Sequence, residues 1–140
     1  MQVLKFGGTS VANAENINKA VAIVQAAVKK EPTVVVVSAL GGITDTLLHC
    51  AALAAEGNEQ YREKLLEIEQ RHLEAVKALI PVAQQSSVLS FVKKSCNEIE
   101  DICNGIFLLR ELSARTKDRM AGYGELLSSR IISARLKTGG

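Results

Sequence analysis

The first part of the chain alternates between short apolar runs and a longer segment in which apolar residues recur every three or four positions. Residues 3–6 and residues 33–38 are the short runs, and the second contains four consecutive valines. Such β-branched runs are typical of strands buried on both faces. Between them, residues 13–30 carry a helical stripe, and Pro32 follows two lysines at its end. This order predicts two parallel strands joined by a helix, with helices covering the sheet.

Longer amphipathic segments make up the middle of the chain. Residues 43–55 are expected to form a helix directly after the second strand. Two long stretches then follow on either side of Pro81, each with apolar residues at three- and four-residue steps. Ser86 or Ser87 is the expected N-cap of the second stretch. A short proline-containing break between two long helices predicts an antiparallel helical hairpin within residues 57–110.

The last part of the chain predicts one more helix, which runs to Lys137. Gly105 lies inside the preceding helix at a cost of about 1 kcal/mol relative to alanine, so we expect a kink or an early end there. Ser113 or Thr116 is the expected cap of the last helix. Residues 139–140 are glycines, which commonly end helices in the left-handed conformation.

The composition indicates a single globular domain. The chain has 140 residues and is 47% hydrophobic, which is enough for one domain with a core. A net charge of +2 and an aromatic content of 4% argue against a nucleic-acid surface. No apolar run approaches the roughly 18 residues of a membrane span. Because the first strand begins almost at Met1, it leaves no room for a signal peptide, and we expect a cytoplasmic protein.

The cysteines and histidines predict core packing rather than chemistry. Cys50, Cys96 and Cys103 are an odd number of thiols, which fits a reducing compartment. Two of them, Cys96 and Cys103, would lie about 10 Å apart along a helix, too far for a disulfide. No spacing of cysteine and histidine resembles a metal site. We expect His72 at the edge of the core, without a catalytic role.

A glycine pair and a hydroxyl pair directly follow the first strand, and we call them the first glycine loop. Its residues are Gly7, Gly8, Thr9 and Ser10. The glycines allow backbone conformations closed to other residues and let peptide N–H groups approach a ligand, while the hydroxyl residues add donors. Lys5 is the charged residue of the strand, and we expect its ammonium in a cleft near the strand end. The loop has the chemistry of a phosphate cradle, although a tight turn beside a solvated lysine also explains it.

A second glycine pair follows the second strand. This second glycine loop, residues 38–42, runs from Ser38 to Gly41 and Gly42 and leads into a polar helix start. Because parallel strands point the same way, the loops that follow them meet at one edge of the sheet, where open α/β folds bind ligands. The pairing of two such loops favours a ligand site over two unrelated turns.

Two further glycines, Gly122 and Gly124, lie within the last helix just before Glu125. Because glycine weakens a helix, its presence there needs a reason. A close approach of the helix to a ligand or to another backbone would be one. Simple packing of the helix against the sheet is the alternative, and the sequence leaves both open.

These motifs together resemble the amino-terminal part of aspartate kinases in the amino acid kinase family. The resemblance depends on Lys5-Phe6-Gly7-Gly8-Thr9-Ser10, on Ser38-Ala39 with Gly42-Ile43-Thr44, and on Gly124-Glu125. It implies an α/β fold with a partial amino-acid-kinase-like parallel sheet, covering helices and a long inserted helical hairpin. Residues 1–140 would be the amino-terminal part of the kinase domain. The hairpin, residues 57–110, resembles the insertion of bifunctional aspartokinase–homoserine dehydrogenases.

The resemblance also implies a role for each motif. Lys5 would neutralise the phosphoryl group that passes from ATP to the β-carboxylate of aspartate, and the first glycine loop would hold its oxygens. Thr44 and Ser38 would line the aspartate site, and Glu125 would pair with the substrate ammonium group. Family members often have a serine two positions before Gly124. This chain has a glycine there, which removes any hydroxyl contact at that position.

Substrates and partners follow from the same resemblance. We expect L-aspartate and ATP with Mg²⁺ as substrates in lysine, threonine and methionine biosynthesis, with no nucleic-acid or membrane partner and with a homo-oligomer as one possible state. No Mg²⁺ ligands are recognisable in the sequence, and family members are much longer, so we expect the chain alone to be inactive. Two alternatives stay open: a kinase for another carboxylate such as acetylglutamate, and a non-catalytic module whose hairpin serves assembly.

Overall fold

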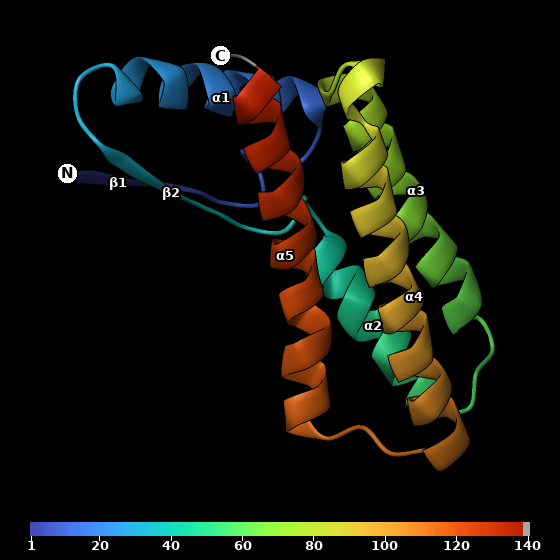
Figure 1. The fold of residues 1–140 in the computed structure, drawn as a ribbon. Helices are drawn as coiled ribbons and strands as arrows, with labels where there is room; N and C mark the ends of the chain where they lie inside the picture. Colours follow the sequence, from blue (N-terminus) through green and yellow to red (C-terminus); the bar gives the residue numbers. More distant parts are fainter. Residues whose placement is uncertain (139–140) are drawn as a thin grey trace.

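A computed structural model describes residues 1–138 of the protein, which form a two-stranded sheet beside a layer of long helices (Figure 1). The elements in chain order are β1 (Gln2–Phe6), α1 (Ala14–Val28), β2 (Thr33–Val37), α2 (Ile43–Ala55), α3 (Tyr61–Leu79), the short 3-10 helix η1 (Val82–Gln84), α4 (Ser86–Leu109) and α5 (Ala114–Thr138). This arrangement confirms the predicted α/β class.

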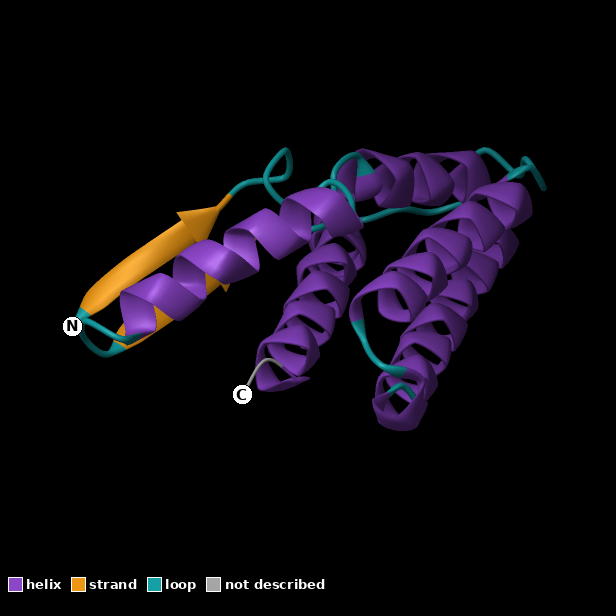
Figure 2. Cartoon of the chain, turned by 90° about the horizontal axis from the view of Figure 1, so that it is seen from above, coloured by secondary structure: helices purple, strands orange, loops and turns teal. Residues whose placement is uncertain are grey.

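The two strands are parallel, as the sequence predicts. Their register pairs Gln2 with Thr33 at one end and Phe6 with Val37 at the other. The connecting helix α1 lies along one face of the sheet (Figure 2). Asn13 caps α1, because its side-chain oxygen accepts a hydrogen bond from the Asn16 N–H at 2.9 Å.

The prediction that the second strand is buried on both faces is wrong for the described residues. Burial alternates along both strands, and Val34 and Val36 remain 44% and 45% exposed. On β1 the exposed positions are Val3 and Lys5, which pair with these two valines. We call this the bare face of the sheet. It is bare because α1 covers only the opposite face, and no described helix takes the same position on this one (Figure 1).

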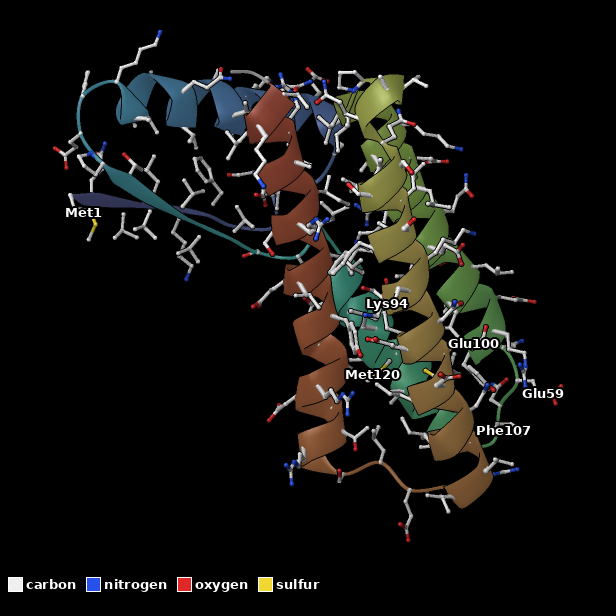
Figure 3. The ribbon with its side chains drawn as sticks, viewed as in Figure 1. Met1, Glu59, Lys94, Glu100, Phe107 and Met120 are labelled. Carbon is white, nitrogen blue, oxygen red and sulfur yellow. The ribbon has the colours of Figure 1, made fainter. Side chains whose placement is uncertain are left out.

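The helical layer, α2 to α5, contains most of the core. The predicted antiparallel hairpin is confirmed, since α3 and α4 run side by side in opposite directions (Figure 1). Met120 of α5 is fully buried and lies inside this layer (Figure 3). Other fully buried large side chains are Tyr61, Ile43, Leu47, Ile68, Ile99, Leu127 and Ile131. None of the described helices is both long and apolar enough to cross a membrane.

Several expectations about helix ends are resolved by the structure. Ser113 caps α5, because its hydroxyl accepts a hydrogen bond from the Thr116 N–H at 3.1 Å. Neither Ser86 nor Ser87 caps α4: the helix already begins at Ser86, after Gln85, whose side chain makes no capping bond. The helix also runs through Gly105 to Leu109, so the early end predicted there is wrong. Residues 139–140, the predicted stop, lie outside the described residues.

The three cysteines are buried and unpaired, which confirms them as core residues. Burial raises the pKa of Cys50 and of Cys96 to about 12 and that of Cys103 to about 11, so these thiols are poor nucleophiles. His72 is more buried than expected. Its exposed fraction is 0%, which places it inside the core rather than at its edge.

Candidate functional site

The two glycine loops meet at the carboxyl ends of the parallel strands, as the sequence predicts. The Ser38 N–H donates to the Phe6 carbonyl at 3.0 Å and extends the pairing of the strands to the start of the second loop. A Cβ on Gly41 would lie 2.9 Å from the Cβ of Ala12 and 3.1 Å from the Gly8 carbonyl oxygen. The loops are therefore in direct backbone contact, and glycine at position 41 permits this approach.

The first glycine loop is a tight turn with open space beside it. The Ser10 N–H donates to the Gly7 carbonyl at 3.0 Å, and Asn16 of α1 donates to the Thr9 carbonyl at 3.0 Å. A Cβ on Gly7 would meet no atom within 4 Å, so there is room for a ligand. Neither glycine of this loop has a positive φ, so the expected need for unusual backbone angles is wrong here. What Gly7 contributes to the loop is the open space beside it.

A shallow pocket of about 250 Å³ opens beside the first glycine loop on the α1 side of the sheet. The hydroxyl residues Thr9 and Ser10 line it together with Asn16 and Lys19 of α1. The apolar residues Phe6, Ala20 and Ile23 complete the lining, so the pocket combines an apolar wall with hydroxyl and amide groups and one cation.

The second glycine loop turns directly into α2. Gly42 has φ +83° and begins the helix in a conformation that side chains rarely adopt. Its carbonyl accepts hydrogen bonds from the Thr46 N–H at 3.1 Å and the Thr46 hydroxyl at 2.9 Å. Ser128 of α5 is fully buried, and its hydroxyl donates to the Ser38 carbonyl at 2.6 Å. The loop is thus held from both α2 and α5.

Gly124 packs α5 against the second glycine loop. A Cβ there would lie 2.7 Å from the Cβ of Ala39 and 3.4 Å from side-chain atoms of Ile43 and Leu47. Close packing thus accounts for this glycine. A Cβ on Gly122, by contrast, would meet nothing within 4 Å, and no contact of the described residues explains the glycine at that position.

Two predicted aspartate-site residues flank this contact. Thr44 follows Ile43 in the first turn of α2, and Glu125 follows Gly124 on α5. Both side chains are exposed. Because Gly124 packs on Ile43, the structure brings the two helical segments together and leaves both polar residues accessible to a ligand.

Lys5 does not point into a cleft between the described elements. It is exposed on the bare face, beside Val36 in the sheet register, and no described carboxylate pairs with it. The alternation of side chains along a strand explains this placement: Phe6 packs toward the core, so Lys5 faces the other way. Its side chain is therefore on the same face of the sheet as Val36.

Arg71 of α3 bonds to the backbone near both loops, and no sequence motif predicts this contact. Its guanidinium donates to the Ala12 carbonyl at 2.8 Å and to the Gly41 carbonyl, so it bonds to the backbone on both sides of the contact between the loops. Nothing local in the sequence marks this arginine, which lies in a helix with many charged residues. Only the packing of α3 reveals it.

No group of three or more histidine, cysteine, aspartate or glutamate residues within 1–138 is arranged to hold a metal ion. What the site offers is backbone and side-chain donors around open space at the ends of two strands.

Comparison with known proteins agrees with this geometry. The profile of the amino acid kinase family matches residues 1–140. Aspartokinase 1, chloroplastic, of Arabidopsis thaliana is 37% identical over 139 residues, covering 97% of this chain and 23% of that protein. Bifunctional aspartokinase/homoserine dehydrogenase 1, chloroplastic, of the same plant is 29% identical over 138 residues, covering 99% of this chain and 15% of that protein. The expected cytoplasmic location stays a prediction.

Solved structures show the same fold. Aspartokinase III of E. coli, in complex with aspartate and ADP, matches with a TM-score of 0.81 and 28% identity. The match covers 98% of this chain and 29% of that one, so residues 57–110 also have a counterpart in a protein named as an aspartokinase alone. The boundary of a hairpin insertion stays a prediction. This chain spans less than a third of the length of these relatives. On its sequence and on its fold, the chain belongs to the amino acid kinase family and is homologous to aspartokinases.

Proposed function

We propose that this chain is the phosphate-holding and aspartate-binding part of an aspartate kinase. The observation that carries the proposal is the direct contact of the two glycine loops at the ends of parallel strands, with Gly124 of α5 packed on the second loop. Family membership and similarity to a protein solved with aspartate and ADP support it.

In the proposed reaction, a β-carboxylate oxygen of L-aspartate attacks the γ-phosphorus of ATP. The bond from that phosphorus to the bridging oxygen breaks, and ADP leaves with the electron pair. The product is an acyl phosphate. The protein's task in such a transfer is to position the reactants and to stabilise charge. ATP would bring Mg²⁺ with it.

The roles of the chain's residues follow from their chemistry. Donors of the first glycine loop hold phosphate oxygens, where Gly7 leaves open space. Lys5 supplies a positive charge at the end of β1. Thr44 offers a hydroxyl to the aspartate, and the Glu125 carboxylate pairs with the substrate ammonium group. The exposure of these last two side chains leaves them available for such contacts.

Binding of aspartate to this chain tests the proposal. We expect L-aspartate to shift the amide signals of Thr44 and Glu125 in an NMR titration, with a Kd of about 1 mM, or about 4 kcal/mol. The affinity is low because one ion pair and one hydrogen bond in an open site contribute little. No shift at either amide at saturating concentrations would contradict the proposal.

Two controls sharpen this experiment. Glu125→Gln should abolish the response, whereas Glu111→Gln, at an exposed glutamate in the α4–α5 connection, should not. N-acetyl-L-aspartate lacks the ammonium group, so its affinity for the wild type should not exceed its affinity for Glu125→Gln. A stronger response to N-acetyl-L-glutamate than to L-aspartate would favour the alternative carboxylate kinase. Aspartate-dependent ADP release above that of Lys5→Ala would contradict the expected inactivity of the chain alone.

A further inference from the structure

Arg71 connects the helical hairpin to the second glycine loop and to Ala12, just after the first glycine loop. It lies in the second half of α3, and its guanidinium is partly buried. One terminal nitrogen donates to the Ala12 carbonyl at 2.8 Å and the other to the Gly41 carbonyl. The Ala12 carbonyl lies just after the first glycine loop, and the Gly41 carbonyl lies within the second. A single side chain therefore bridges two segments that are distant in sequence.

The bridge lies where the loops touch. Ala12 and Gly41 lie close together, because a Cβ on Gly41 would lie 2.9 Å from the Ala12 Cβ and 3.2 Å from the Ala12 Cα. Arg71 also lines a pocket of about 220 Å³ together with Ala12 and Leu40. The arginine therefore supports the contact between the loops directly, rather than through the core.

The charged guanidinium of Arg71 donates its hydrogen bonds to backbone carbonyls. No described carboxylate forms an ion pair with it. Hydrogen bonds from a charged donor are about twice as strong as neutral ones, and the planar guanidinium can reach two acceptors at once. A lysine ammonium is a point charge and would not hold both carbonyls with the same geometry.

The position of the charge is also informative. Ala12 directly precedes the N-cap of α1, and Gly41 directly precedes the N-cap of α2. The N-terminus of a helix carries a partial positive charge, so a cation there is unfavourable by itself. Two helix starts and a guanidinium at one contact create a positive region, which an anionic ligand in the loops would offset.

We propose that Arg71 is a positioning residue, which fixes the spacing of the two glycine loops so that the phosphate-holding and aspartate-binding segments act as one site. The ligand part of this statement rests on the proposed function. The helical hairpin, residues 57–110, thereby sets the geometry of the loops from which the ligands are held.

The first test measures the loops without any ligand. We compare the wild type with Arg71→Lys, Arg71→Gln and, as the matched control on the same helix, Arg62→Gln, whose side chain lies over the ring of Tyr61. The readout is amide hydrogen exchange by NMR at Ser10 and Ile43, whose N–H groups donate to the Gly7 and Leu40 carbonyls at 3.0 and 2.9 Å.

In Arg71→Gln we expect exchange at both amides to be at least about tenfold faster, because two charged hydrogen bonds are lost. Arg71→Lys should fall between the wild type and this variant, and Arg62→Gln should match the wild type. Exchange at Ile99, buried in α4, should not change. Unchanged exchange at the loop amides would overturn the proposal, and so would an equal acceleration at Ile99, which would indicate general destabilisation only.

The second test separates this inference from the proposed function. L-aspartate is titrated into the same variants, and we expect about tenfold weaker binding to Arg71→Gln than to the wild type and to Arg62→Gln. If the wild type does not bind aspartate, the proposed function fails and the exchange data still decide whether Arg71 holds the loops. If Arg71→Gln binds aspartate as tightly as the wild type, the positioning role is wrong while the proposed function stands.

Discussion

Leu127 of α5 and Val34 of β2 are both apolar residues in regular structure, yet they are 0% and 44% exposed. The same contrast extends to the regions that contain them. Each helix of the helical layer packs against others of the layer, while the sheet is covered by α1 on one face and has a bare face opposite. Apolar character alone therefore does not determine burial here. Burial depends on which element packs against each face.

The glycine loops lie between these two regions and take their support mainly from the helical layer. Ser128 of α5 and Arg71 of α3 bond to the loop backbone, and Gly124 packs against Ala39. The bare face contributes only the exposed Lys5 near the loops. Stability and loop geometry should accordingly depend on the helical layer, and association should depend on the bare face.

The largest effect is expected from Leu127→Ala in the helical layer. The side chain is fully buried, so its truncation leaves a cavity and should lower the free energy of unfolding by about 2–5 kcal/mol. The matched control is Leu126→Ala on the same helix, where the side chain is 48% exposed and the loss should stay below about 1 kcal/mol. Urea unfolding measures both. An equal loss of unfolding free energy in the two variants would contradict the division between buried and exposed positions.

A smaller effect is expected where α5 meets the second glycine loop. In Gly124→Ala the new methyl would lie 2.7 Å from the Ala39 Cβ, so we expect a loss of about 1–3 kcal/mol from overpacking. Gly122→Ala adds a methyl that meets nothing within 4 Å, and the better helix propensity of alanine should stabilise the fold by up to about 1 kcal/mol. Thermal unfolding of the pair gives the comparison, and the two variants should shift Tm in opposite directions.

A pH dependence of similar or smaller size should come from His72. Its Nδ1 lies 2.6 Å from the Ile68 carbonyl and must donate to it, while the buried Nε2 has no described partner. Burial lowers the pKa of His72 in the folded state, whereas the unfolded chain takes up the proton near pH 6.5. The contribution of neutral His72 is complete above that pH and is lost as the pH falls toward the lowered folded-state pKa.

Urea unfolding between pH 7.5 and pH 5 measures this loss. The slope assigned to His72 should approach, at most, about 1.4 kcal/mol per pH unit. His72→Met should lack it, and His49→Gln, at an exposed histidine, should keep it. A His72→Met variant with the full wild-type slope would show that another group titrates.

The smallest effect on stability is expected on the bare face. Val34→Thr and Val36→Thr, at 44% and 45% exposure, should each change the free energy of unfolding by about 0.5 kcal/mol or less. Val35→Thr, directed toward the covered face, should cost more. Either urea or thermal unfolding resolves the difference, and an equal cost at positions 34 and 35 would show that the bare face is covered in solution.

The same exposed valines should matter more for association. A two-stranded sheet with open edges and an apolar face favours pairing with a second copy. We expect sedimentation equilibrium of the wild type to show a concentration-dependent mass above 15 kDa, and the double variant Val34→Thr/Val36→Thr to reduce it. A wild type that stays near 15 kDa at every concentration would rule out this association.

Much of the site could be predicted from the sequence because its motifs are local. Paired glycines after apolar runs indicate turns, and parallel strands bring such turns to one edge, which the contact between Gly41 and Ala12 confirms. The face of the sheet that Lys5 occupies does not follow from the sequence. Strand alternation fixes which residues share a face, but only packing decides which of the two faces the core covers.

The type and order of the helices and strands follow from the amino-acid sequence, because helical stripes and β-branched runs reflect local backbone and side-chain preferences. Caps at Asn13 and Ser113 belong to the same class of local signals. The exposure of Val34, the full burial of His72 and the bonds of Arg71 to Ala12 and Gly41 do not follow from the sequence and are seen in the folded structure. These features depend on contacts between residues far apart in the chain, and a hydrophobic or charge pattern contains no information on which distant segment will be the partner.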